Sequence, residues 1–177
     1  MGELTRIIPV WRSFALLVAL LGLLTIQGCG GGLLFSYQGA QLRKGHEIPI
    51  AESAPHAQTS QTRDVTVTYS CAVENDQFRV AGRVCFASHL TWNFVGLRYF
   101  NLSIVVADAN NTIIANHSLV SAGCFDNICD VTFDSNLKLA QASSASSFAF
   151  IYTGEAGVGG DGGRASACNF WDCPVYR

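Results

Sequence analysis

VTVTYSCAVENDQFRVAGRVCF, residues 65 to 86, decides the fold of this 177-residue chain. On both sides of the polar triplet at 74–76, apolar side chains recur at every second position, and many of them are β-branched or aromatic. Such alternation is typical of strands with one buried face, and the triplet is typical of a turn. The stretch therefore predicts a hairpin. Its buried face carries Val65, Val67, Tyr69 and Cys71 on one strand and Phe78, Val80, Val84 and Phe86 on the other.

The same period of two recurs along the rest of the chain. It runs from Phe100 to Val106, and residues 112–120, 129–139 and 147–154 continue it between polar turns. No segment has a convincing helical period. Six short strands at fairly regular spacing predict an all-β fold, namely an antiparallel two-sheet sandwich, Ig-like or related, that is stapled by disulfides.

Residues 1–28 have the composition of a secretory signal peptide. Arg6 and Arg12 precede an apolar stretch from Phe14 to Ile26, after which two residues lead into Cys29. A membrane-spanning helix needs about 20 mostly apolar residues, and this stretch is shorter. We therefore interpret residues 1–28 as a signal that is removed on export.

The residues Ile26-Gln27-Gly28-Cys29 resemble the lipobox of bacterial lipoproteins, which has an aliphatic residue three positions before a cysteine and a small residue directly before it. The resemblance implies cleavage before Cys29 and acylation of this residue with fatty acids such as palmitate. Several acyl chains, at ~0.8 kcal/mol per buried CH₂, would hold the chain firmly on a membrane. It also implies a location in the bacterial cell envelope, at the outer membrane, because glycine and not aspartate follows the cysteine.

The last thirty residues carry a second, less specific resemblance. FAFIYTG at 148–154, the glycine-rich loop after it and the pair Phe170-Trp171 resemble bacterial lipoproteins that have no assigned activity. This likeness supports the class of protein and implies no reaction.

Residues 29–63 look like a tether between the lipid and the folded domain. Glycine opens this stretch, and proline, serine, glutamine and threonine dominate its end. Such a composition predicts a flexible coil, and ~34 residues would give it a root-mean-square reach of about 30 to 35 Å. The sandwich domain is then expected to span residues 64–177, with LLFSYQG at 33–39 as a stretch that could dock back onto it.

The charge balance argues against nucleic acid as a partner. The formal net charge of the whole chain is −2, and the signal contributes one excess positive charge, so the mature chain is mildly acidic. Nucleic-acid binders need clustered basic side chains that release counterions. The densest basic spot here is the isolated pair Arg43-Lys44.

Six cysteines remain once Cys29 is assigned to lipid. An even number in an exported chain predicts up to three disulfides, formed among Cys71, Cys85, Cys124, Cys129, Cys168 and Cys173. A local bond between Cys124 and Cys129 closes a small loop and meets no geometric objection. The hairpin register places Cys71 opposite Val80 on the buried face and Cys85 on the outer face, so a bond between these two would need a bulge. The other pairings stay open, with Cys168 to Cys173 slightly favoured.

The remaining candidate motifs concern metal ions, phosphate binding and catalysis. The spacings at 124–129 and 168–173 are at the loose end of the range for zinc ligands, so disulfides are the favoured interpretation and no metal or cofactor is predicted. The glycines between 154 and 163 lack the Lys-Ser/Thr ending of a phosphate loop, so a flexible loop is favoured there. An envelope hydrolase remains the alternative function, with His117, a nearby serine and the carboxylates Asp108 and Asp130 as its site.

Three side chains are candidate binding residues. Trp92 lies beside His89 in a stretch of loop character, where an exposed tryptophan would suit contact with a protein or a glycan, although core packing is its ordinary role. Trp171 belongs to a tail that is expected to fold back with Phe170 over one end of the sandwich. The sequence therefore predicts a membrane-anchored envelope protein with a binding or structural role, whose partners are the membrane and either another envelope protein or a glycan.

Overall fold

The computed structural model describes residues 36–50, 53–74, 77–124, 127–138, 144–158 and 166–176, without the side chains of residues 53–56 and 74. The chain divides into two units, Met1–Phe35 and Ser36–Arg177, and only the second contains described residues. The predicted signal peptide and Cys29 lie outside the described residues.

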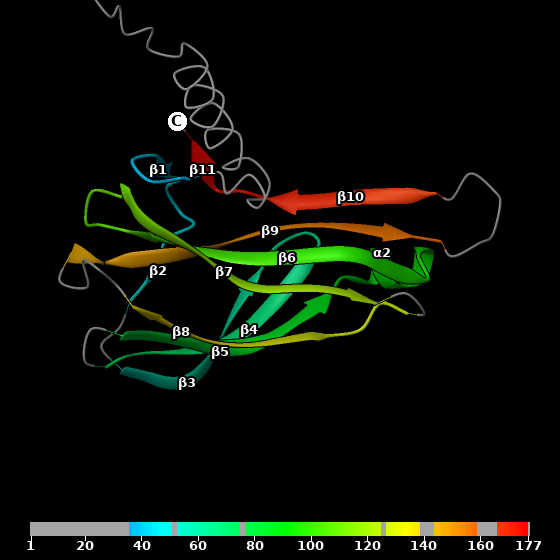
Figure 1. Cartoon of the computed structure of the whole chain (residues 1–177), viewed down its shortest axis with the longest axis horizontal. Helices are drawn as coiled ribbons and strands as arrows, with labels where there is room; N and C mark the ends of the chain where they lie inside the picture. Colours follow the sequence, from blue (N-terminus) through cyan, green and yellow to red (C-terminus); the bar gives the residue numbers. More distant parts are fainter. Residues whose placement is uncertain are drawn as a thin grey trace, which may run out of the picture. The chain divides into compact units, whose positions relative to one another are not determined.

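Two antiparallel sheets face one another in the second unit (Figure 1). The first sheet has the order β3-β4-β5-β8, with bounds Ser53–Gln61, Val65–Glu74, Gln77–Phe86 and Val131–Lys138. The second has the order β10-β9-β6-β7, with bounds Ala167–Asp172, Ser147–Gly157, Gly96–Ala107 and Ile113–Cys124. The short strand β2, Ile48–Pro49, also pairs with β9, and the helix α2, Ser88–Asn93, joins the two sheets. The predicted all-β sandwich is confirmed.

The hairpin formed by β4 and β5 has the predicted register. Cys71 lies opposite Val80, and the pairing continues without a shift from Val65↔Phe86 to Glu74↔Gln77. Since side chains alternate between the two faces of a strand, this register places every predicted apolar residue on the face toward the second sheet. Phe86 is the least enclosed of them, because it lies at the end of its strand and is only partly buried.

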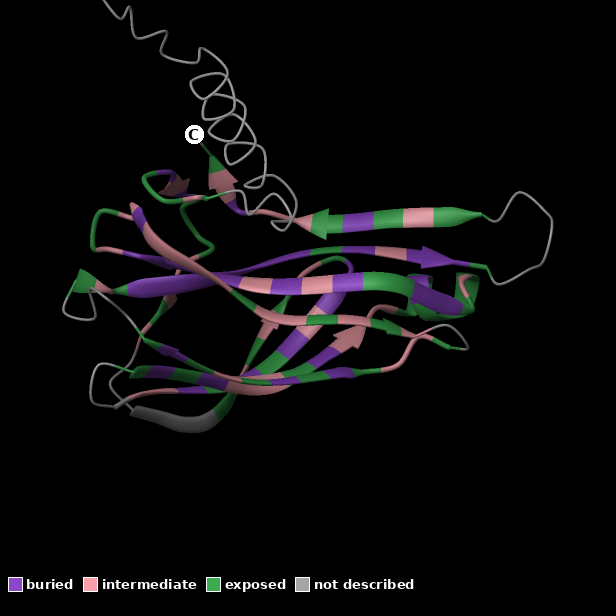
Figure 2. Cartoon of the chain, in the orientation of Figure 1, coloured by how far each residue is buried: buried purple, intermediate pink, exposed green. Residues whose placement is uncertain are grey.

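An aromatic layer fills the space between the sheets. Phe148 and Phe150 of β9 lie with their ring centroids 5.7 and 5.1 Å from that of Tyr69 on β4. The ring centroid of Phe78 on β5 lies 5.3 Å from that of Phe148. Edge-to-face contacts at such distances add to the free energy gained by burying the rings. Figure 2 shows the resulting alternation of buried and exposed residues along β4 and β5.

A second, smaller core lies on the opposite face of the second sheet. The strand β1, Gln41–Leu42, pairs with β11, Val175–Tyr176, and this two-stranded layer covers Ala149 and Ile151 of β9. Because both faces of β9 are covered there, all residues from Ser147 to Tyr152 are buried. The continuous apolar run in the sequence reflects this double burial.

The prediction of a flexible tether over residues 29–63 is wrong for the described part of that stretch. Residues 41–61 contribute β1, β2 and β3, and Leu42 is only 1 % exposed. The polar composition of β3 misled the prediction, because an edge strand with one paired side tolerates polar side chains. Gln58 of β3 even accepts a hydrogen bond from the Tyr69 hydroxyl at 2.8 Å.

The C-terminal tail folds back as predicted, but through one aromatic residue instead of two. Phe170 of β10 is 1 % exposed and lies over Phe100, with the ring centroids 6.2 Å apart. Trp171 has the opposite orientation on the strand and is 67 % exposed, so the expectation that it covers the core is wrong. Gly154 of β9 makes room for the buried ring, since a Cβ atom there would lie 2.3 Å from Cζ of Phe170.

We predict that Gly154→Ala lowers the free energy of unfolding by about 1 to 3 kcal/mol, because the new methyl group forces the Phe170 ring out of its position. Equilibrium unfolding in urea measures this change. The double variant Gly154→Ala/Phe170→Leu should recover part of the loss, and Thr153→Ala, an exposed neighbour, is the control. An unchanged unfolding free energy in Gly154→Ala would contradict the packing described here.

Candidate binding cleft

A cleft of about 680 Å³ opens at one edge of the sandwich. It lies where β3 and β4 of the first sheet face β2, β9 and β10 of the second. Its volume is in the range of small-ligand sites, about 300 to 1,000 Å³. The lining residues are Gly45, His46, Glu47, Ile48, Ser60, Gln61, Thr62, Arg63, Asp64, Val65, Val67, Ala149, Phe150, Tyr152, Trp171, Asp172 and Pro174.

The walls of the cleft differ in chemical character. The floor is apolar, with Val67 on one side and Phe150 on the other. The β3 wall carries small polar side chains, such as Ser60, that face inward from an edge strand. A mostly apolar pocket with a few polar groups is the usual form of a binding site, because the apolar area supplies affinity and the polar groups select orientation.

A buried carboxylate anchors the inner end of the cleft. Asp64 is only 2 % exposed, and its Oδ1 lies 3.0 Å from Nε of Arg63 and 3.1 Å from Nε2 of His89. Its Oδ2 accepts a hydrogen bond from the hydroxyl of Tyr152 at 3.2 Å. A buried charge is tolerated only when it is paired and hydrogen-bonded, and these three partners meet that requirement.

The same network ties the two sheets together. Tyr152 belongs to β9 of the second sheet, whereas Thr62 and Asp64 precede β4 of the first. The hydroxyls of Thr62 and Tyr152 lie 2.8 Å apart, and the Thr62 hydroxyl also lies 3.0 Å from the carbonyl oxygen of Val65. The network therefore fixes the width of the cleft at this end.

Burial raises the pKa of Tyr152 to about 12, and the neighbouring Asp64 charge adds to this shift although the Thr62 hydrogen bond opposes it. Burial likewise raises the pKa of Tyr69 to about 12. Both phenols are therefore neutral at physiological pH. They act in the cleft and core as hydrogen-bonding groups and not as nucleophiles.

The outer rim of the cleft carries net negative charge. Glu47 and Asp172 lie on the rim together with Arg63, whose guanidinium is already paired with Asp64. Hydrogen bonds from its own backbone N–H and that of Gly45, with one from the Asn111 side chain at 2.8 Å, hold the pKa of Glu47 below its usual value. The rim therefore favours a cationic group on a ligand.

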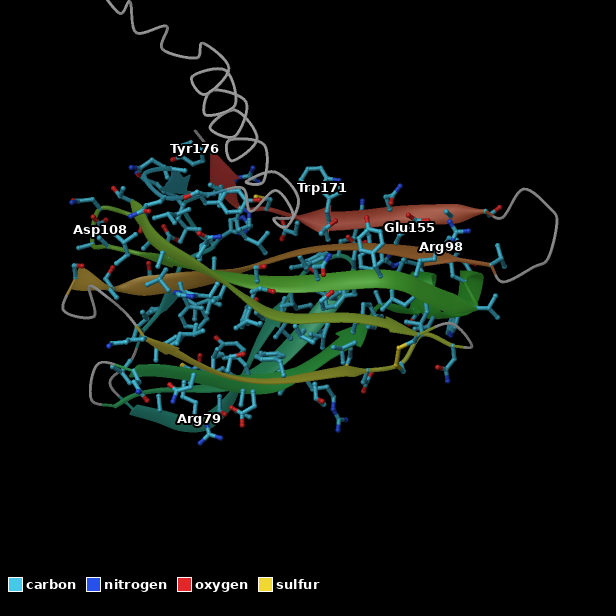
Figure 3. The ribbon with its side chains drawn as sticks, in the orientation of Figure 1. Arg79, Arg98, Asp108, Glu155, Trp171 and Tyr176 are labelled. Carbon is cyan, nitrogen blue, oxygen red and sulfur yellow. A yellow bond between two sulfur atoms is a disulfide. The ribbon has the colours of Figure 1, made fainter. Side chains whose placement is uncertain are left out.

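The three predicted binding residues do not meet at one site. Trp171 reaches the rim of the cleft, and Figure 3 shows it projecting from β10. His89 touches the cleft only through its contact with Asp64. Trp92 is 84 % exposed on α2 and does not line the cleft, so the expectation of core packing is wrong for it.

Of the predicted disulfides, the bond between Cys124 and Cys129 is present (Figure 3). It clips the end of β7 to the loop before β8, with the Cα atoms 6.4 Å apart. Cys71, Cys85, Cys168 and Cys173 are free thiols, so the prediction of further bonds among them is not supported by the structure.

Strand geometry explains why Cys71 stays apart from Cys85, and Cys168 from Cys173. Cys71 is in the main core, whereas Cys85 belongs to the opposite face of its sheet, as the register predicts. Cys168 packs against the main core and Cys173 against the smaller core on the other side of the second sheet. Cysteines on opposite faces of a sheet cannot bond without moving the backbone.

The residues of the predicted hydrolase site are engaged separately. Asp108 accepts backbone hydrogen bonds from Asn110 and Thr112 in its own turn, and Asp130 pairs with Arg83 at 3.6 Å. His117 lies opposite Ile104 on the face toward the core, and its Nε2 is buried without a hydrogen-bond partner in the described part of the chain. The three side chains therefore form no catalytic arrangement.

No group of three or more histidine, cysteine, aspartate or glutamate side chains among the described residues could hold a metal ion. No helix in that part of the chain is both long and apolar enough to cross a bilayer.

Comparison with known proteins gives no match to a family model, to a curated protein or to a solved structure.

Sequence reasoning did not find the residues that build the cleft. The sequence predicts Asp64 only as the first residue of the sandwich domain. It predicts Glu47 as part of the flexible tether. One local signal for Asp64 exists, because a charged residue directly before an alternating apolar strand is a turn and capping position. No local signal could bring Glu47 and Asp172 to one rim, since 125 positions separate them in the sequence.

Raising the pH should weaken the fold through Tyr152 and Tyr69. Their pKa values are about 12 in the folded protein and about 10 in an unfolded chain, so they stabilise the fold fully below pH 10. This contribution is lost progressively between pH 10 and pH 12. Urea unfolding across that range should show a fall in unfolding free energy that is smaller in Tyr152→Phe. An equal fall in the variant would exclude Tyr152 as a source.

Proposed function

We propose that this protein is a lipid-anchored protein of the bacterial envelope that binds a ligand in the cleft between its sheets. The observation that carries the proposal is the cleft itself. It combines an apolar floor, an inward-facing polar wall and a charged rim, and the Asp64 network holds it open between the sheets. No catalytic arrangement accompanies it in the described residues, so binding is the function that these features support best.

The anchor is supported by the sequence alone, through the signal peptide and the lipobox ending at Cys29. The second unit begins at Ser36, seven residues after that cysteine. Seven residues span at most about 25 Å when fully extended. An acylated Cys29 would therefore keep the sandwich close to the membrane surface. A tether of ~34 residues would allow a larger distance.

A binding role fits partners that the same envelope offers, namely another envelope protein or a glycan. Both present polar groups and modest apolar area to a cleft of this kind. The negative rim favours a partner with positive charge.

Replacing the lipidated residue tests the anchor. We expect the mature wild-type chain to begin at Cys29, to carry fatty acid detectable by mass spectrometry, and to enter the detergent phase on phase separation. Cys29→Ser should abolish the acylation and leave the chain in the aqueous phase. A wild-type chain that begins at Met1 and carries no fatty acid would refute the proposed anchor.

Photo-crosslinking in intact cells tests the binding role. A photoreactive amino acid at Ser60, which faces inward on the cleft wall opposite Val67, should yield a reproducible adduct, because a bound partner lies within reach of that side chain. The same amino acid at Thr132, which is exposed on β8 outside the cleft, is the matched control. Adducts of equal yield at both positions, or none at Ser60, would argue against the cleft as the binding site.

A further inference from the structure

The edge of β9 that borders the cleft is only partly paired. The strand β2 pairs with Ser147 and Phe148, and β10 pairs with the residues from Tyr152 onward. Between them, residues 149–151 have no strand partner on this edge within the described chain, although β6 pairs with them on the other side. The gap is three residues long, about 10 Å of strand.

Two hydrogen bonds show which residue in the gap presents its backbone to the cleft. The N–H of Ile50 donates to the carbonyl of Ser146 at one end of β9, and the N–H of Val158 donates to the carbonyl of Ser166 at the other. In an antiparallel pair, alternate residues point their N–H and C=O groups to the same edge. Even-numbered residues of β9 therefore face this edge, and Phe150 is the one in the gap.

Among the described residues, no segment fills the position opposite Phe150. Extending the β10 register would place Pro174 there, and proline has no backbone N–H to donate. The carbonyl of Pro174 instead accepts from the N–H of Arg43. Extending β2 would place His46 there, but its N–H donates to the carbonyl of Arg43. Both neighbouring segments thus turn away at the point where pairing with Phe150 would occur.

An unpaired strand position on a cleft wall matches an extended peptide better than a sugar. A peptide strand offers an N–H and a C=O at the spacing that a sheet edge requires, which is the basis of strand addition. A sugar ring is bound by stacking on an exposed aromatic face. The exposed tryptophan of this cleft, Trp171, is on the opposite face of β10 from Phe170 and reaches only the rim.

The negative charge of the cleft rim favours a peptide with basic side chains. The rim carboxylates Glu47 and Asp172 have no ion pair within the described residues, whereas Arg63 is paired with Asp64. Basic side chains on the peptide would offset their charge, because successive residues of a strand point to opposite faces of the sheet.

We propose that the cleft binds an extended peptide segment of a partner protein, an inference that rests on the proposed binding function. This segment pairs with the backbone of Phe150 between β2 and β10 and carries basic side chains that offset the charge of Glu47 and Asp172. Because β2 and β10 are both antiparallel to β9, the bound segment runs antiparallel to β9 as well.

The test uses the full mature chain in detergent micelles and an acetylated, amidated pentapeptide of alternating valine and lysine. The ¹⁵N–¹H signal of Phe150 should shift on titration, and its amide should exchange more slowly with solvent. A peptide N-methylated at its central amide should bind about tenfold more weakly, because it loses the donor that pairs with the Phe150 carbonyl. The corresponding valine-glutamate peptide should bind more weakly than the lysine peptide.

Matched variants separate the charge from the fold. Glu47→Gln/Asp172→Asn should weaken binding of the lysine peptide, and Asp130→Asn, on the outer side of the first sheet, should leave it unchanged. Equal affinity of the N-methylated peptide, or no binding of the lysine peptide, would overturn the inference. Binding of chitotriose in the cleft without peptide binding would do so while leaving the proposed binding function intact. Failure of all probes together with absent crosslinks at Ser60 would overturn both.

Discussion

The packing of aromatic rings from β9 against β4 and β5 is the interaction on which the rest of the structure depends. The rings of Phe148 and Phe150 fill the space between the sheets and contact Tyr69 and Phe78. Buried aromatic area of this size dominates the free energy of a small sandwich, since each ring buries about 150 to 250 Å². The spacing of the sheets, and so the width of the cleft, follows from the size of these rings.

The sandwich is closed on one side and open on the other. The disulfide between Cys124 and Cys129 clips the β7 end to the β8 side, where the two sheets contact each other. On the other side, β3 faces the interrupted edge formed by β2, β9 and β10. The Asp64–Tyr152 contact bridges the sheets there without filling the space, which leaves a cleft in place of a continuous core.

Where the sequence signal is local, prediction from it was accurate. The hairpin register, the outward position of Cys85 and the bond between Cys124 and Cys129 all follow from neighbours within about twenty residues. The errors concern edges and tails. The sequence predicts linker where β3 lies because edge strands need little apolar surface. It predicts Trp171 over the core because composition does not reveal on which face of a strand a residue lies.

The sequence predicts the site much less well than it predicts the fold. Of the candidate binding residues, Trp171 lines the cleft and His89 supports it, whereas Trp92 is elsewhere on the surface. The thiols that were expected to bond are divided between the two sides of their sheets. These outcomes depend on which strands become neighbours, and strand order is not encoded in any single segment.

The amino-acid sequence by itself determined the all-β class, the main hairpin, one disulfide and the reasons for expecting a lipid anchor at Cys29, because each depends on short-range pattern or spacing. Only the tertiary structure decided that Gln41–Leu42, Ile48–Pro49 and Ser53–Gln61 form strands and that Glu47, Asp64, Tyr152 and Asp172 surround one cleft. It also decided that, within the described part of the chain, Phe150 has no strand partner on one edge of β9. The physical reason is that hydrogen-bond pairing between distant strands, and the proline that interrupts it, act only once the two sheets have been assembled.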